Sequence, residues 1–472
     1  MRVRCGLVAG LVALVAGTAV ARDPEQVSRW AEEGKVRAEK MRGLEFFKDV
    51  PVEFMTRGQI EEAILEVVER DMPPEWRVRV DRGYKAFGLV SMDSDVIDDM
   101  IRLVVSQAGG FYDPEAEQVI LPDDLEAFMG QMVGEAAAMA PGFMEQLMRN
   151  ILTHEFTHAL QDQHHGLDAL LDATLEDDDV RLAVTALVEG DATLIGTGAM
   201  MSADGDMTAL LERDPAAMGA MMGAGGGMVG GEAQAMPKIL QETLIFPYVH
   251  GYVLVATMVQ RGGFAAVDAA FDDPPISSEQ LLHIEKYLGE QRDEPTAIKL
   301  PDIDLEQLGW STVSENTLGE FQIRVLLGNS PDAIVAAEGW DGDRFQVWEH
   351  EDGRLGLAWI SVWDSDADAK QFAEELIYHE GRRFDGEAAR QRRTVEGERL
   401  EIAVGGEMDV SWVTVEGDTV ALTRGFPVER VEVIEDSVRR FSRMSTKTWA
   451  GIRAAAEEAE AEGAVIPRPE SR

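Results

Sequence analysis

The chain has 472 residues, of which 87 are Asp or Glu and 43 are Lys or Arg, so its formal net charge is −44 at pH 7. A surface this acidic repels nucleic acid and anionic membranes, and we expect neither as a partner. The only cysteine, Cys5, rules out a disulfide framework and a cysteine-ligated structural zinc site. Stability must therefore come from a hydrophobic core, and the length allows two or three domains.

The N-terminal segment predicts export. A basic head, Met1–Arg4, precedes an apolar run over 6–20 and the small residues Ala19-Val20-Ala21. This pattern predicts a signal peptide over 1–21 and a periplasmic or extracellular protein, with a retained N-terminal anchor as the alternative. Cys5 precedes the apolar run, so it is a poor candidate for a lipid-modified mature N-terminus.

The next segments predict a small sheet and its flanking helices. We expect a helical lead-in over 22–48 that could cover a site until it is removed. Further along, the pattern predicts a strand over 50–55 and helices over 57–70 and 96–107. Two short strands, 109–113 and 117–121, are predicted around the turn at Asp113-Pro114. A free edge of this pair could bind an extended peptide through backbone hydrogen bonds.

Three apolar helices are predicted in the middle of the chain, over 143–164, 180–200 and 241–259. Residues 201–236 alternate Met with Gly and Ala, which predicts a flexible insertion or lid. Methionine thioethers could also bind copper(I), which is the alternative reading of this segment. Together with the preceding strands, these helices form a predicted domain over 49–300.

The composition changes after about residue 301. Alternating residues predict five strands and two helices, and the overall fold class is therefore α+β; the strands are 344–349, 355–362, 399–404, 410–415 and 419–423, and the helices are 366–380 and 431–442. We expect a C-terminal α+β domain over 301–449, with no catalytic motif, and a frayed Ala/Glu-rich tail over 450–472.

The segment His154-Glu155-Phe156-Thr157-His158 is an HExxH motif inside a predicted helix. Residues four apart lie on one face of a helix, so both imidazoles can bind one metal ion, with Glu155 beside them as a base. A catalytic zinc site needs a third protein ligand. Glu189 is the candidate, because it is an acid in an apolar helix, where an ionised carboxylate needs a partner or a metal.

Other residues compete for the role of third ligand. His164 has the metzincin spacing, but Gln161 occupies the position where that motif has the glycine that turns the chain. His165 and Asp168 are further alternatives. Asp162 or Asp191 could hold a ligand imidazole by a hydrogen bond.

The order His154-Glu155-x-x-His158 followed by Glu189 resembles that of gluzincin metallopeptidases. Longer phrases resemble a group of largely uncharacterised exported bacterial proteins presumed to be gluzincin-like peptidases, with similarity over roughly residues 50 to 340. The phrases are Gly110-Phe111-Tyr112-Asp113-Pro114-Glu115, HExxHALQDQ from His154 to Gln163, Leu187-Val188-Glu189-Gly190-Asp191-Ala192, Phe246-Pro247-Tyr248-x-x-Gly251 and Ser278-Glu279-Gln280-x-Leu282-His283-x-Glu285-Lys286-Tyr287.

The resemblance implies a mainly helical thermolysin-like core with a small antiparallel sheet. It implies Zn²⁺ bound by His154, His158 and Glu189, a peptide or protein substrate, and Glu155 as the general base that activates water. Tyr248, His283 and Tyr287 are implied as catalytic donors to the oxyanion, with Tyr112 as a further possibility. The Met/Gly segment at 201–236 departs from the compact form expected of this family.

Two other functions fit the same residues. The zinc chemistry would also serve an amidase or deacylase, because it acts on any amide. A non-catalytic metal-binding interaction protein is the third hypothesis, although such a protein would not need Glu155. The oligomeric state cannot be predicted from the sequence.

Overall fold

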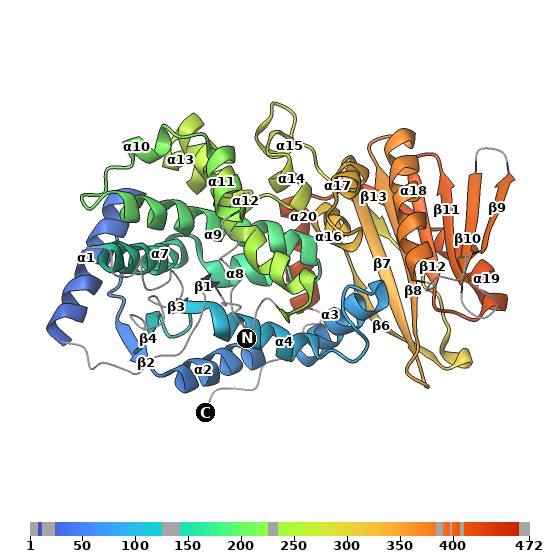
Figure 1. The fold of residues 1–472 in the computed structure, drawn as a ribbon, viewed down its shortest axis with the longest axis horizontal. Helices are drawn as coiled ribbons and strands as arrows, with labels where there is room; N and C mark the ends of the chain where they lie inside the picture. The colour runs from blue at the N-terminus through green and yellow to red at the C-terminus, as the bar shows by residue number, and fades with distance from the viewer. Residues whose placement is uncertain are drawn as a thin grey trace.

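A computed structural model describes residues 8–11, 24–124, 142–224, 235–383, 390–396, 399–405 and 410–461 (Figure 1). The rest of the predicted signal peptide and the end of the predicted tail lie outside these residues. The fold class is α+β, as predicted: a mainly helical part at the N-terminal side adjoins a large antiparallel sheet (Figure 1).

The helical part carries a small four-stranded sheet, with the strand order β1-β3-β4-β2. Its strands are β1 (Val8–Leu11), β2 (Val52–Met55), β3 (Ala108–Asp113) and β4 (Gln118–Pro122). The predicted pairing of β3 with β4 is confirmed, and Glu117 adopts a positive φ of 52° between them. In the full chain, the β3 edge that was predicted to be free pairs antiparallel with Val8–Leu11, which lie within the predicted signal peptide.

Helices of this part follow the predicted order, with additions. They are α1 (Pro24–Arg42), α2 (Arg57–Asp71), α3 (Pro74–Phe87), α4 (Val96–Gln107), α7 (Phe143–His165), α8 (Leu167–Asp172), α9 (Asp178–Met201), α10 (Thr208–Leu211), α11 (Pro215–Ala224), α12 (Lys238–Gly262), α13 (Phe264–Asp272), α14 (Ser278–Leu282) and α15 (Glu285–Leu288). The sequence analysis did not anticipate α3, which begins with Pro74 at its first turn, a position that tolerates proline.

Helix α9 is the centre of the helical core. Most of its residues are buried, and it packs against both α7 and α12. Of the described helices, α12 alone is long and apolar enough to cross a membrane, and 67% of its apolar window is buried inside the protein. In this structure α12 is therefore a core helix.

Residues 201–224, predicted to be part of a flexible insertion or lid, include two short helices that pack on the core. Met207 and Met218 are buried in the same core as α9 and α12. Helix α11 lies so close to α12 that a Cβ at Gly219 would come within 2.4 Å of Val253. The small residues that suggested flexibility serve close packing instead. Residues 225–234 lie outside the described part.

The C-terminal part is built on a seven-stranded antiparallel sheet, with the order β6-β7-β8-β12-β11-β10-β9. Its strands are β6 (Trp310–Asn316), β7 (Trp340–His350), β8 (Leu355–Trp363), β9 (Arg390–Glu396), β10 (Arg399–Gly405), β11 (Val410–Glu416) and β12 (Thr419–Arg424). Alternation places Trp359 and Ile360 in separate cores on opposite faces. One core is covered by α16 (Gly319–Leu326), α17 (Pro331–Ala337) and α18 (Asp366–Arg382), and the other by α19 (Val428–Val438).

The chain ends differently from the prediction. The predicted helix over 431–442 is α19, which ends at Val438, and β13 (Ser442–Thr446) then pairs with β5 (Thr296–Lys299). The short helix η2 (Glu306–Leu308) precedes β6. The expected frayed tail begins as α20 (Trp449–Ala461), and its Trp449 is buried in the helical core.

Packing crosses the predicted domain boundary at residues 300 and 301 in both directions. Phe87 at the end of α3 contacts Phe345 and Trp359 of the large sheet, with ring centroids 5.0 and 5.2 Å away. In the other direction, Trp449 joins the core around α9. The two parts are therefore interlocked, and neither predicted segment contains its whole core.

Candidate metal centre

His154, His158 and Glu189 converge in the interior between α7 and α9. The His154 Nε2 atom lies 3.1 Å from His158 Nε2 and 3.3 Å from Glu189 Oε2, and His158 Nε2 lies 3.5 Å from Glu189 Oε2. The three side chains are almost fully buried, with exposed fractions of 7%, 0% and 2%. The sequence-predicted ligand set is thus brought together by the fold.

The triangle has the size that a tetrahedral zinc ion requires. With bonds of about 2.0–2.1 Å, neighbouring ligands of a tetrahedral ion lie about 3.3 Å apart. The three measured edges of 3.1, 3.3 and 3.5 Å bracket this value. Glu189 Oε2 has no hydrogen-bond partner among the described residues. Two imidazole nitrogens and a carboxylate oxygen are a donor set that suits zinc.

Glu155 lies beside the triangle. It is 1% exposed, and neither carboxylate oxygen has a partner with hydrogen-bonding geometry among the described residues. Burial raises the pKa of Glu155 above its ordinary value, while His154 and His158 lower it in part. The carboxylate of Glu155 is therefore a buried acceptor whose oxygens bond to no side chain among the described residues.

The charges at the site explain how Glu189 stays ionised. Burial raises the pKa of Glu189, but hydrogen bonds and charge from His154 and His158 outweigh it and bring this pKa to about 2. Burial lowers the pKa of His158, and Glu189 with its neighbours reverses this effect so that the net direction is upward. Two buried carboxylates thus need positive charge beside them, which a divalent cation would supply with neutral imidazoles.

The rival ligands lie elsewhere because α7 continues past the motif. The helix ends at Gly166, which has a φ of 67°. His164 lies six residues beyond His158, nearly two turns further along the helix, and its Nε2 atom lies 2.9 Å from the Glu45 carbonyl oxygen. His165 stacks on Phe271 with ring centroids 4.2 Å apart. Asp168 lies on α8, after the turn at Gly166.

Two glycines let α12 approach Glu189. A Cβ on Gly190 would lie 2.2 Å from the Gly251 backbone, and one on Gly251 would lie 1.9 Å from the Ala186 carbonyl oxygen. Because the helices touch backbone to backbone here, Tyr248 reaches the site and its hydroxyl donates to Glu189 Oε1 over 2.9 Å. Burial, with the charge of Glu189, raises the pKa of Tyr248 well above its ordinary value.

The structure does not connect the other two predicted oxyanion donors with the triangle. His283 Nε2 lies 3.0 Å from Glu320 Oε1, and the Tyr287 hydroxyl donates to the Asp273 carbonyl oxygen over 2.8 Å. Both residues follow α14, whose Ser278 contacts Asp179. Asp179 and Glu189 are ten residues apart on α9, or about 15 Å along the helix.

The group that holds a ligand imidazole is Gln161, which the sequence analysis noted only as a missing glycine. Its Oε1 atom lies 2.8 Å from His158 Nδ1. Asp191 is linked to His158 through Gln161, because its carboxylate accepts a hydrogen bond from Gln161 Nε2 over 3.0 Å. Asp162 instead accepts from the Tyr112 hydroxyl over 3.0 Å. The available signal was spacing, because residue 161 follows His158 by three and shares its helix face.

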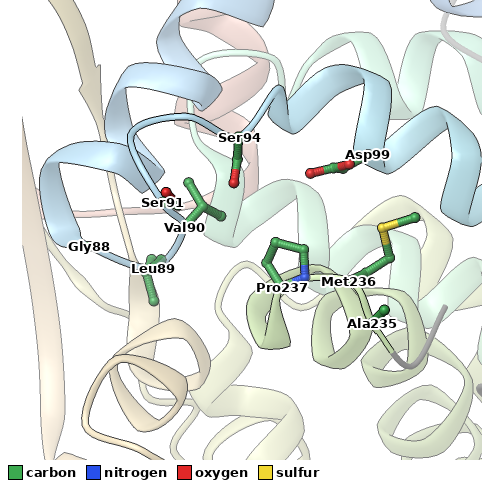
Figure 2. Close-up of a pocket in the computed structure, with 9 residues that line it drawn as sticks. All are labelled: Gly88, Leu89, Val90, Ser91, Ser94, Asp99, Ala235, Met236 and Pro237. Atoms are coloured by element: carbon green, nitrogen blue, oxygen red, sulfur yellow. The ribbon is translucent and has the colours of Figure 1, made fainter. Parts of the chain in front are cut away.

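A separate pocket of about 500 Å³ lies between the α3–α4 connection and the start of α12. In Figure 2, Ser91, Ser94 and Asp99 face Met236 and Pro237 across it. Asp99 is already paired with Arg102, at 2.6 Å. Neither Ser91 nor Ser94 makes a hydrogen bond with Asp99, so the buried triangle remains the candidate site.

Comparison with known proteins gives one match. The family model of a domain of unknown function, DUF8575, matches residues 306–435, which form most of the large sheet and its helices. No curated protein and no solved structure matches the chain.

Proposed function

We propose that this protein is an exported zinc-dependent peptidase, which acts in the periplasm or outside the cell. The observation that carries the proposal is the triangle of His154, His158 and Glu189, with the buried carboxylate of Glu155 beside it, which accepts no side-chain hydrogen bond from the described residues. Ligands alone would suit a structural metal. A buried base whose carboxylate contacts no side-chain donor with hydrogen-bonding geometry among the described residues suits hydrolysis.

The roles of the residues follow from their positions. A zinc ion held by His154, His158 and Glu189 would polarise a carbonyl group and lower the pKa of water. Glu155 accepts the proton of the attacking water and passes it to the leaving amine. The Tyr248 hydroxyl donates to the Glu189 carboxylate, and it would serve as a donor to an oxyanion by turning its proton away from Glu189.

Strand β3 supports a peptide as the substrate. Its edge pairs with the extended segment Val8–Leu11, in an antiparallel register that sets Val8 opposite Tyr112. The Tyr112 backbone also lies close enough to Glu155 to lower the pKa of that carboxylate. If the predicted signal peptide is removed after export, the same edge becomes available to a substrate strand beside the base.

The first experiment measures metal content and hydrolysis together. We expect one zinc ion per chain in the purified protein without residues 1–21, and none in Glu189→Ala. Glu155→Gln should retain zinc but lose at least about a hundredfold in peptide hydrolysis, because general acid–base catalysis contributes about 10²–10⁴-fold. His164→Ala is the matched control and should retain both zinc and activity.

The outcomes separate the alternative functions. Zinc with hydrolysis of acylated amines or cell-wall amides, but not of peptides, would indicate the amidase or deacylase. Zinc without any hydrolysis in the wild type would favour a metal-binding interaction protein. Unchanged hydrolysis in Glu155→Gln would overturn the catalytic assignment.

A further inference from the structure

A buried chain of polar groups runs from His158 back to helix α1. His158 Nδ1 lies 2.8 Å from Gln161 Oε1, and Gln161 Nε2 donates to the Val188 carbonyl oxygen and to Asp191 Oδ2 over 2.9 and 3.0 Å. Arg42 Nε donates to the same Asp191 oxygen over 2.8 Å. All four side chains are buried.

The chemistry of these groups allows only one orientation of the Gln161 amide. Val188 presents a carbonyl oxygen and Asp191 a carboxylate, and both can only accept. The NH₂ group of Gln161 must therefore face α9, and both of its protons are used there. This leaves Oε1, which is also only an acceptor, facing His158.

The same reasoning then fixes the histidine. An acceptor at 2.8 Å requires a proton on His158 Nδ1. In the neutral ring, the lone pair is consequently on Nε2, the atom that lies 3.1 Å from His154 Nε2 and 3.5 Å from Glu189 Oε2. Free imidazole has no such constraint.

We propose that Gln161 is a positioning residue that selects the metal-binding tautomer of His158, and that Asp191 and Arg42 hold Gln161 in this orientation. The inference refines the proposed metal site. It also gives the lead-in helix a role other than the removable cover considered above. Arg42 is 1% exposed and pairs with Asp191 and Asp268 at 2.8 and 2.6 Å, so removal of residues 22–48 would leave Asp191 buried without its cation.

The test compares three variants on α7 by NMR of the metal-free protein with ¹⁵N-labelled histidine, at a pH where the imidazoles are neutral. In the wild type, the His158 proton should be on Nδ1. Gln161→Leu removes the acceptor, and we expect the proton to move to Nε2 in a large fraction of molecules. Gln161→Glu keeps an acceptor, so the His158 Nδ1 proton should remain. The new carboxylate would lie beside that of Asp191, and their repulsion should lower the stability of the folded protein.

Zinc affinity, measured by competition with a chelator, is the second readout. It should fall about 10- to 100-fold in Gln161→Leu, the range typical of lost hydrogen bonds to a ligand histidine. Gln163→Leu is the matched control on the same helix, because the hydrogen bonds of the Gln163 side chain within the described part of the chain go to the backbone of residues 47 and 48. This control should change neither the tautomer nor the affinity.

The outcomes distinguish this inference from the proposed function. If Gln161→Leu keeps the Nδ1 proton and binds zinc within twofold of the wild type, the positioning role is wrong while the zinc site stands. If no form binds zinc, the proposed function is wrong, and the NMR comparison still tests the role of Gln161. Should Gln161→Leu fail to fold, Gln161→Met is the substitute, because it keeps the length of the side chain. The same shift of the His158 proton and the same loss of zinc affinity are expected of it.

Discussion

Each carboxylate oxygen of Glu189 has a separate task. Oε2 faces the two histidines, whereas Oε1 accepts from the Tyr248 hydroxyl over 2.9 Å. Tyr248 also stacks near His154, with ring centroids 6.2 Å apart. One aromatic side chain thus orients two of the three proposed ligands, and this arrangement can be tested by removing a single oxygen atom.

We expect Tyr248→Phe to weaken zinc binding about tenfold, because outer hydrogen bonds to ligands contribute about 10- to 100-fold to affinity. Chelator competition measures the change. Tyr252→Phe is the control, since Tyr252 lies one turn further along α12 and is buried in the core. Equal affinities for wild type and Tyr248→Phe would show that the hydroxyl does not support Glu189.

At the residue scale, the sequence identified the groups whose chemistry is local. His154 and His158 share a helix face by spacing alone, and Glu189 stood out as an acid among apolar residues. Gln161 was passed over because its importance depends on acceptors from α9, which only the tertiary structure brings near. For the same reason, the partners of His283 and Tyr287 could not be predicted.

Helix α9 packs closely against α7 and α12 because glycines lie at the points of contact. Gly190 meets Gly251 of α12, and a Cβ on Gly196 would lie 3.2 Å from that of His154 on α7. The distances among the proposed ligands therefore depend on the absence of side chains at positions next to them.

We expect Gly251→Ala to destabilise the protein by about 3 kcal/mol or more, because the added methyl group would overlap the Ala186 carbonyl oxygen. Urea unfolding measures this change. Gly58→Ala is the control, since a Cβ there meets nothing within 4 Å. Equal unfolding midpoints for wild type and Gly251→Ala would mean that α12 can shift away without cost.

The start of α9 carries a buried acid, Asp179, that makes the stability of the fold depend on pH. Asp179 accepts from the Ser278 backbone nitrogen at 3.2 and 3.1 Å. Burial, with the charge of Asp177 against that of Lys447, holds the pKa of Asp179 well above its ordinary value. A group whose pKa is raised on folding stabilises the folded state fully at pH values below its pKa in the unfolded chain. This stabilisation is lost as the pH rises through its pKa in the folded protein.

Asp179→Asn should therefore become more stable than the wild type as the pH rises from 5 to 9. We expect a difference of more than about 1 kcal/mol, since one pKa unit corresponds to about 1.4 kcal/mol. Unfolding at several pH values measures it, with the exposed Asp302→Asn as control. Parallel stability curves for wild type and Asp179→Asn would contradict this reading.

At the element scale, prediction succeeded where a segment carries its own periodicity. Helix α4 was predicted with its observed bounds, Val96–Gln107, and alternation predicted the strands β11 and β12 to within one residue at each end. Helices α10 and α11 were missed because Met, Ala and Gly have no marked polar face, and their helical state depends on packing against α12. The pairing of the β3 edge was not predicted, because its partner is about a hundred residues away.

Each of the two parts of the molecule contributes a large side chain to the hydrophobic core of the other. Helix α3 contributes Phe87 to the core of the large sheet, and α20 contributes Trp449 to the core around α9. Arg424 of β12 also donates to the Ala86 carbonyl oxygen on α3. Figure 1 shows α20, in red, beside helices from the first half of the chain.

We expect Trp449→Ala to destabilise the helical part by about 3–5 kcal/mol, the usual cost of truncating a buried tryptophan. Bound zinc should then be released at a lower urea concentration than in the wild type. Met444→Ala is the control, because Met444 is 53% exposed. Unchanged zinc release in Trp449→Ala would show that α20 is dispensable for the metal centre.

The position of Trp449 also sets an order of events during synthesis. Domains usually fold as they leave the ribosome, beginning with the N-terminal one. Here the core around α9 lacks one of its large side chains until residue 449 has been added. The core that surrounds α9 is therefore complete only when the polypeptide is nearly finished.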